Sequence, residues 1–149
     1  MDKTEFWKLI ALINVNALDE GDDDAAVEPL KLALIKKTEN ELFEFEEQLS
    51  QHLYAIDGET FADNAGESGG SDDAFLYARC FVVAKGQAFY EAVKADPVKM
   101  PKSLDQWCEA ILYPHRNAWA ELKNCEPDEW PFSASVSYES ASNPALWTR

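Results

Sequence analysis

TENELFEFEEQLSQHLYAIDG, residues 38–58, has the clearest helical periodicity in this chain of 149 residues. Thr38 and Glu41 form a capping-box pattern, in which each side chain binds a backbone N–H of the first turn. The apolar residues that follow are three or four positions apart, which places them on one face of a helix: Leu42, Phe45, Leu49, Leu53 and Ile56. The segment therefore predicts an amphipathic helix that ends at Asp57-Gly58.

The polar side of this helix is strongly acidic. Four glutamates lie off the apolar stripe: Glu39, Glu44, Glu46 and Glu47. A second acidic segment, residues 19–24, precedes it and is expected to be too charged for burial; it contains Asp22, Asp23 and Asp24. The whole chain has 28 acidic against 13 basic residues, a formal net charge of −15. Such a surface repels nucleic acid and anionic lipid and attracts basic partners, although charge of this kind also serves solubility alone.

Further helices are expected before and after residues 38–58. A first helix is expected to run from a cap at Asp2 to Ala17, and a second to carry Pro29 in its first turn and end near Ile35. Residues 58–70 are rich in glycine and serine and are expected to form a loop.

Three more helices are predicted beyond that loop. Ser71 is expected to cap a helix that reaches Gly86, and a short helix is expected around Tyr90. Residues 103–106 form another capping-box pattern, which is expected to begin a helix that Pro114 kinks or splits.

The C-terminal segment, residues 125–149, differs from the rest because three prolines exclude a long helix. Within it, residues 133–138 alternate serine with apolar side chains, a period of two that is typical of extended chain. Its aromatic residues suggest that it wraps the helical body. The fold class expected is therefore all-α: one domain over residues 1–149, a helical bundle of about six helices with an irregular C-terminal wrap.

Three features of the sequence indicate the cellular compartment: the length of its apolar runs, its N-terminal residues and its cysteines. The longest apolar runs fall short of the roughly 20 residues that span a bilayer, and the N-terminal residues lack the pattern of a secretory signal. The three cysteines, Cys80, Cys108 and Cys125, have no close pairing, which indicates reduced thiols. We therefore expect a cytoplasmic protein that is not inserted in a membrane.

The segment GGSDDAFLYARC, residues 69–80, contains the one polar constellation that could be a site. Arg79 shares the apolar stripe of the expected helix, so its burial would require a carboxylate partner, with Asp72 and Asp73 or the acids of residues 39–47 as candidates. A buried ion pair is one interpretation. The other is a small polar pocket formed by Ser71, Asp72, Asp73 and Arg79.

Other site chemistry finds no support in the sequence. The glycine-rich loop lacks the lysine of a phosphate-binding P-loop, and its two aspartates would repel phosphate. The acidic segments do not match the ligand spacing of an EF-hand, and the chain has only two histidines and no close cysteine pair for zinc. A nucleophilic pair of Cys108 with His115 is possible, but a buried cysteine among apolar neighbours is the simpler interpretation. We expect no metal, no cofactor and no catalytic residue.

The motifs F-W-x-L-I at residues 6–10 and S-D-D-x-F-x-x-x-R at residues 71–79 are similar to those of a bacterial family of unknown function, DUF4240. The resemblance covers about the first two thirds of the chain. It supports the fold and the constellation of Asp72, Asp73 and Arg79, and it implies no reaction.

Three functional hypotheses follow. The first is a non-catalytic cytoplasmic interaction protein, such as an immunity-type inhibitor of a basic toxin domain, which uses the acidic segments and the tryptophans Trp130 and Trp147 as anchors. The second is a small-molecule-binding protein or minor enzyme with its site at Asp72, Asp73 and Arg79. The third is an acidic mimic of nucleic acid.

Overall fold

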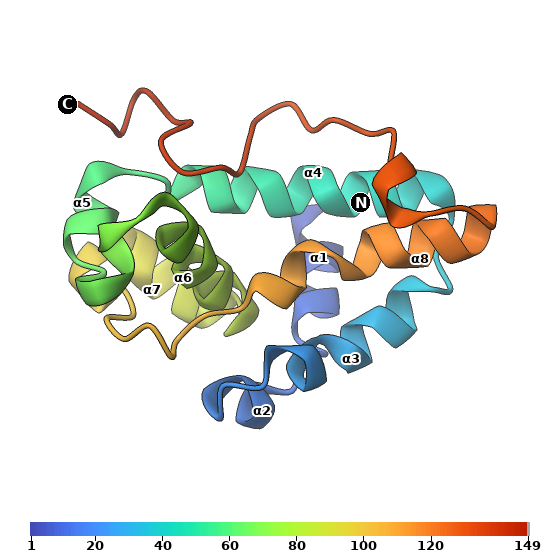
Figure 1. Ribbon diagram of the computed structural model, residues 1–149, viewed down its shortest axis with the longest axis horizontal. Helices are drawn as coiled ribbons and strands as arrows, with labels where there is room; N and C mark the ends of the chain where they lie inside the picture. The colour runs from blue at the N-terminus through green and yellow to red at the C-terminus, as the bar shows by residue number, and fades with distance from the viewer. Residues whose placement is uncertain (149) are drawn as a thin grey trace.

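In the computed structural model, which describes residues 1–148, the predicted central helix is present as α4 (Glu39–Ala55). It is the longest helix and lies along one side of the molecule (Figure 1). Thr38 and Glu41 form the expected capping box. All five residues of the apolar stripe are fully buried: Leu42, Phe45, Leu49, Leu53 and Ile56.

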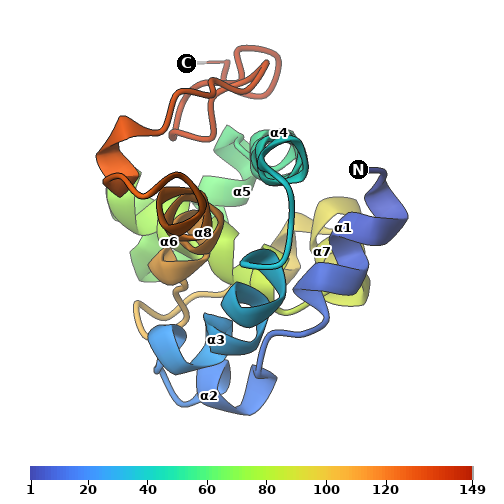
Figure 2. The ribbon, with the colours of Figure 1, turned by 90° about the vertical axis from the view of Figure 1, so that its right-hand side faces the viewer.

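The described chain is all-α, as predicted, with eight α-helices and no β-strand in residues 1–148. Viewed along α4, α1 and α7 lie on one side and α6 and α8 on the other, with α2 and α3 opposite α4 (Figure 2). The remaining helices are α1 (Lys3–Ile10), α2 (Val15–Asp19), α3 (Asp23–Leu34), α5 (Glu59–Asp63), α6 (Asp72–Ala84), α7 (Gln87–Ala95) and α8 (Pro114–Lys123). Four short 3₁₀ helices, η1 (Gly66–Gly70), η2 (Pro97–Lys99), η3 (Glu109–Leu112) and η4 (Pro127–Glu129), complete the set.

The N-terminal prediction was wrong about helix boundaries. One helix was expected up to Ala17, but α1 ends at Ile10 because the Asn14 side chain caps a new helix by accepting from the N–H of Ala17. The next helix, α3, begins at Asp23 rather than near Pro29, because Asp22 caps it. Pro29 therefore lies inside α3, on its exposed side, where water can bind the carbonyl that the proline ring leaves unpaired.

The loop predicted for residues 58–70 is also partly helical, since it contains α5 and η1. Phe61 is buried and anchors α5 in the core. Gly66 has a φ of 57°, and a Cβ there would lie 2.5 Å from the carbonyl oxygen of Lys102. The glycines of this segment thus allow a compact turn packed against another part of the chain, instead of a long open loop.

The helix predicted from residue 103 does not form. The Gln106 side chain accepts from the N–H groups of both Lys102 and Ser103, which closes a turn. Only η3 follows, and Pro114 is the first residue of α8 instead of a kink inside a longer helix. Proline suits the first helical position because the N–H that it lacks has no partner there.

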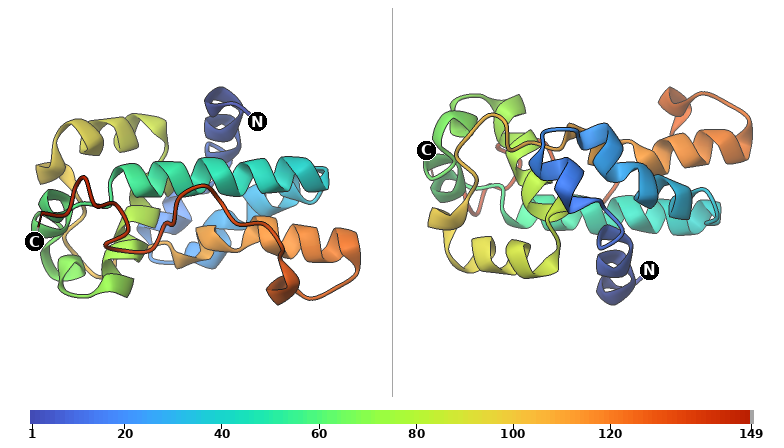
Figure 3. Two further views of the ribbon diagram at one scale, coloured as in Figure 1. Left: turned by 90° about the horizontal axis from the view of Figure 1, so that it is seen from above. Right: turned by 90° about the horizontal axis from the view of Figure 1, so that it is seen from below.

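The C-terminal segment wraps the body as predicted. After η4 it runs along α4 toward α5 (Figures 1 and 3). Residues 132–140 alternate between partly buried and exposed, so the period of two in the sequence is real although the segment pairs with no strand. We refer to residues 132–148 as the C-terminal strap.

Candidate functional site

Arg79, the centre of the predicted constellation, lies on α6 and is fully buried beneath the C-terminal strap. Its Nη1 donates to the carbonyl oxygen of Leu53 at 3.0 Å, and its Nη2 to Oγ of Ser140 at 3.0 Å. The guanidinium carbon lies 4.8 Å from the ring centroid of Phe75, and Nε has no hydrogen-bond partner in the described chain. The expected ion pair is therefore wrong: no carboxylate of residues 1–148 forms one with Arg79.

The other members of the constellation stay at the surface. Ser71 caps α6 by accepting from the N–H of Ala74, and Asp72 and Asp73 are exposed in the first turn. The arginine side chain extends the other way, toward α4 and the strap. One link remains, because the Ser140 hydroxyl that accepts from Arg79 donates to the backbone carbonyl of Asp72 at 2.7 Å. No open pocket unites these residues.

A second buried charge, Asp57, was missed by sequence reasoning. Its carboxylate is fully buried and accepts four hydrogen bonds from the strap. Oδ1 accepts from the N–H of Ala141 and from Nε1 of Trp147, at 3.0 and 2.8 Å. Oδ2 accepts from the N–H groups of Ser142 and Asn143, at 2.7 and 3.1 Å. Asp57 thus holds the strap mainly through the backbone N–H groups of residues 141–143.

The two buried charges influence each other over a longer range than an ion pair. Burial lowers the pKa of the Arg79 guanidinium, and the negative charge of Asp57 acts in the opposite direction. Both groups are fully buried beneath the strap, so neither is accessible to a ligand.

Glu46, predicted as a partner-binding acid, is only 3% exposed. Its Oε1 accepts from Nε2 of His115 at 2.9 Å and from Nε of Arg116 at 2.8 Å, and its Oε2 accepts from Nε1 of Trp130 at 3.0 Å. Burial alone would raise the pKa of Glu46, but the hydrogen bonds and charges of His115 and Arg116 outweigh it and lower the pKa. Glu46 therefore joins α4 to α8 and to the segment before the strap, and both of its oxygens are engaged within the chain.

The other three acids of α4 that were predicted to bind a partner are also engaged within the chain. Glu39 accepts from Nε1 of Trp119 at 2.9 Å and pairs with Lys123. Glu47 accepts from the N–H and hydroxyl of Ser135.

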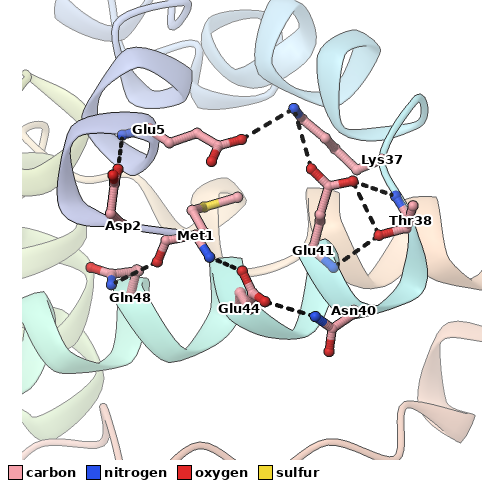
Figure 4. A network of polar contacts seen from close by, with 9 residues as sticks. All are labelled: Met1, Asp2, Glu5, Lys37, Thr38, Asn40, Glu41, Glu44 and Gln48. Carbon is pink, nitrogen blue, oxygen red and sulfur yellow. Dashed lines mark hydrogen bonds and ion pairs between the residues drawn. The ribbon is translucent and has the colours of Figure 1, made fainter.

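Glu44 pairs with the amino group of Met1, beside the caps of α1 and α4 (Figure 4). The predicted acidic outer face of α4 is therefore mainly a contact surface for α1, α8 and the strap.

Trp130 and Trp147, which were predicted to anchor a partner, pack against other residues of the same chain. Trp130 makes edge contacts with the rings of Phe43, His115 and Trp119. Trp147 meets the ring of Phe75 edge-on, with its centroid 6.0 Å away. Their indole N–H groups donate to Glu46 and Asp57, so neither is free to insert into a partner.

Of the acids predicted to bind a partner, those that stay exposed lie at the start of α3. Asp23 is buried, against expectation, because its Oδ2 accepts from the N–H of Ala110 at 2.9 Å. Asp22, Asp24 and Glu28 are exposed, and none of them forms an ion pair with another residue of the described chain. Three exposed acids without an ion pair therefore lie in the first half of α3 and at its cap.

Two adjoining hollows separate α3 from α8. One, of about 180 Å³, has Asp24, Glu28 and Tyr113 in its walls, and the other, of about 390 Å³, has Glu121. Both include Lys31 and Asn117, so they form one continuous depression, which we call the α3–α8 groove. The Tyr113 side chain is 43% exposed at its edge. Three acids and an exposed aromatic residue thus line a groove that is open to solvent.

We next consider metal-binding groups and thiols in residues 1–148. No cluster of three or more metal-binding side chains occurs in residues 1–148, and no helix there could cross a membrane. All three cysteines are free thiols, as predicted. Burial raises the pKa of Cys80 to about 12 and that of Cys108 well above its usual value, so both are protonated at neutral pH.

Sequence reasoning missed five residues that organise this region: Asp57, His115, Arg116, Ser140 and Asn143. For His115-Arg116 a signal existed, because they are adjacent basic residues directly after Pro114 in a very acidic chain. Asp57 was assigned only a role in ending α4, and nothing local to it indicates that residues 84 to 90 positions later would bind it.

Comparison with known proteins gives one match. Residues 1–133 match a family described as protein of unknown function (DUF4240), a range longer than the two thirds expected. Searches of curated proteins and of solved structures returned no match. The matched range ends where the C-terminal strap begins, so it contains Asp57 and Arg79 but few of the residues that cover them.

Proposed function

The chain belongs to the DUF4240 family, and we propose that it is a non-catalytic cytoplasmic interaction protein that binds a basic protein through the α3–α8 groove. An immunity-type inhibitor, which blocks the active site of a basic toxin domain, is the form of this function that we favour. The observation that carries the proposal is the exposure of Asp24 and Glu28 in an open groove, while the acids of α4 are engaged within the chain.

The charge distribution supports a basic partner. The net charge of −15 speeds the approach of a cationic protein, and at physiological ionic strength only charges within about 8 Å act strongly on it once it is near. The unpaired carboxylates of Asp24 and Glu28 would then meet lysine or arginine side chains at the contact. Lys31, at the middle of the groove, would repel a cation placed there and so help to fix the register of the partner.

The groove also offers a residue suited to specific binding. Tyr113 combines an exposed ring with a hydroxyl that donates to Glu109 at 2.6 Å, so its orientation is fixed before a partner arrives. Aromatic residues of this kind contribute more to the lifetime of a complex than charges at the rim, which mainly change the association rate. Tyr113 replaces Trp130 and Trp147 as the candidate anchor.

Capture from the native host, with the chain as bait, tests the proposal when two matched variants are included. Asp24→Asn with Glu28→Gln removes two charges from the groove, and Glu67→Gln with Asp105→Asn removes two exposed charges elsewhere. We expect a basic protein to be captured by the parent and by the second variant, and to associate on the order of threefold more slowly with the first at low salt. Equal association rates for the two variants would show that the α3–α8 groove is not the binding site.

The inhibitory role requires a second measurement. If the captured protein is a toxin domain, its activity should fall when the chain is added in equimolar amount, and Tyr113→Ala should shorten the lifetime of the complex. The nucleic-acid mimic predicts a different result, in which the captured protein binds DNA or RNA and the nucleic acid competes with the chain. A captured protein that is acidic would refute both.

A further inference from the structure

A hollow of about 200 Å³ lies between α1, α4 and α7, on a different part of the molecule from the α3–α8 groove. His52 of α4 forms part of its wall and is only 8% exposed. The imidazole stacks on the ring of Phe6, with centroids 4.9 Å apart, and meets Trp7 and Tyr90 edge-on. The aromatic residues thus hold the histidine ring in one orientation.

The hydrogen bonding of His52 defines its tautomer. Nδ1 lies 2.7 Å from the carbonyl oxygen of Gln48, which can only accept, so Nδ1 carries a proton. Burial lowers the pKa of His52, the hydrogen bond to Gln48 partly opposes this, and the charges of Lys3 and Lys94 lower the pKa further against a smaller effect of Glu91. The ring is therefore neutral at pH 7, and Nε2 has a lone pair that no residue of the described chain engages.

Two ammonium groups converge on the same hollow. Lys3 comes from the first turn of α1 and Lys94 from the last turn of α7, and both are exposed. Neither forms an ion pair with a residue of the described chain, although acids outnumber bases by more than two to one. Glu91 is the one carboxylate in the walls of the hollow, so its local charge is positive in an acidic protein.

We propose that this hollow binds a phosphate group, with its charged oxygens at Lys3 and Lys94 and its protonated oxygen donating to Nε2 of His52. A phosphate that carries a proton supplies both negative charge and an O–H donor, which are the two features that these three side chains recognise. Sulfate has the charge without the donor at neutral pH, and a carboxylate also lacks it. The ligand is inorganic phosphate, which keeps a proton at pH 7, whereas a phosphate monoester has lost its last proton there and lacks the donor.

Titration of the full chain with inorganic phosphate and with sulfate, at pH 7 and constant ionic strength, tests whether a phosphate O–H donates to Nε2 of His52. Binding is followed by NMR through the imidazole nitrogens of His52. We expect phosphate to bind about three- to tenfold more tightly than sulfate, the value of one added hydrogen bond. Equal affinities would overturn the proposal, as would shifts that do not include Nε2. Phenyl phosphate is a second test of the donor: at pH 7 it is mostly the dianion without an O–H, so it should bind more weakly than inorganic phosphate, and tighter binding would overturn the proposal.

Charge variants test the geometry without disturbing the core, because the residues changed are exposed. Lys94→Gln should weaken phosphate binding about two- to fivefold, the range of an exposed ion pair, and Lys3→Gln should do the same. Lys36→Gln, an equal change of charge at an exposed residue of another surface, should leave it unchanged. Glu91→Gln should tighten binding, because it removes the opposing charge. Equal effects of Lys94→Gln and Lys36→Gln would show a general charge effect and refute the site.

Discussion

Asp57→Asn is the substitution that most directly tests how the C-terminal strap is held. The asparagine has the same shape but replaces one carboxylate oxygen by an NH₂ group. Each oxygen of Asp57 accepts two hydrogen bonds from the strap, so either orientation of the amide leaves two partly or fully buried N–H donors without an acceptor. A buried polar group that loses its partner costs about 1–3 kcal/mol, which gives a loss of about 2–6 kcal/mol in the free energy of unfolding.

Urea unfolding, followed by tryptophan fluorescence and by circular dichroism, measures this loss. With a urea dependence of about 2 kcal/mol per M for a chain of this size, the unfolding midpoint should fall by about 1–3 M. Hydrogen exchange should show faster exchange of the amides of residues 141–143, which donate to Asp57. Asp105→Asn is the matched control, because Asp105 is exposed, and it should change stability by less than about 0.5 kcal/mol.

The result that would refute this reasoning is equally specific. If Asp57→Asn costs less than about 1 kcal/mol and the three amides remain protected, the strap is held by its apolar contacts and not by the carboxylate. If fluorescence and circular dichroism give different midpoints, the strap detaches before the helical body unfolds, and the loss must be divided between two transitions.

Three further outcomes are expected. The free energy of unfolding should fall from pH 7.5 to pH 5.5, because burial lowers the pKa of His52 and His115 in the folded chain and the unfolded chain therefore binds protons first. The change is at most about 1.4 kcal/mol per pH unit for each histidine, and urea midpoints that do not change with pH would contradict this prediction. Arg79→Met should lower the free energy of unfolding in urea by less than Asp57→Asn does, because methionine fills an apolar site and the guanidinium had no carboxylate partner. A larger decrease would mean that the guanidinium is essential for holding the strap. All three thiols should react with a thiol reagent in denaturant without reductant but only Cys125 in the folded protein, and fewer than three would reveal a disulfide.

The sequence predicted helices well where local signals agree. For α4, the capping box, the apolar period and the terminal Asp-Gly all specify one helix, and its length was predicted within one residue. The helix predicted from Ser103 failed because its capping-box residues are also suited to a turn. The Gln106 side chain closes that turn, while the N–H of Cys108 donates to the carbonyl oxygen of Tyr77 on α6. A contact between distant segments decided the outcome, and no local pattern reports it.

The candidate site was predicted less well for the same reason. That Arg79 is buried follows from its place on an apolar stripe, and this was predicted. Its partners could not be, because Leu53 and Ser140 are 26 and 61 residues away and one of them is a backbone carbonyl. Charge alone also cannot distinguish an acid that faces a partner from one such as Glu47, which binds the strap.

The strap explains why several acids of α4, the most acidic helix of the described chain, are engaged within the chain. An extended segment without a neighbouring strand leaves its backbone N–H groups unpaired, and each one that is covered needs an acceptor. Carboxylates are strong acceptors, and Glu47, Asp57 and Glu46 supply them to the backbone of the strap and to the indole of Trp130. Part of the acidic surplus thus replaces the hydrogen bonds of a missing sheet. On α3, Asp23 serves the backbone N–H of Ala110 in the same way, whereas Asp24 and Glu28 are exposed and form no ion pair in the described chain, which is why we propose them for the contact with another protein.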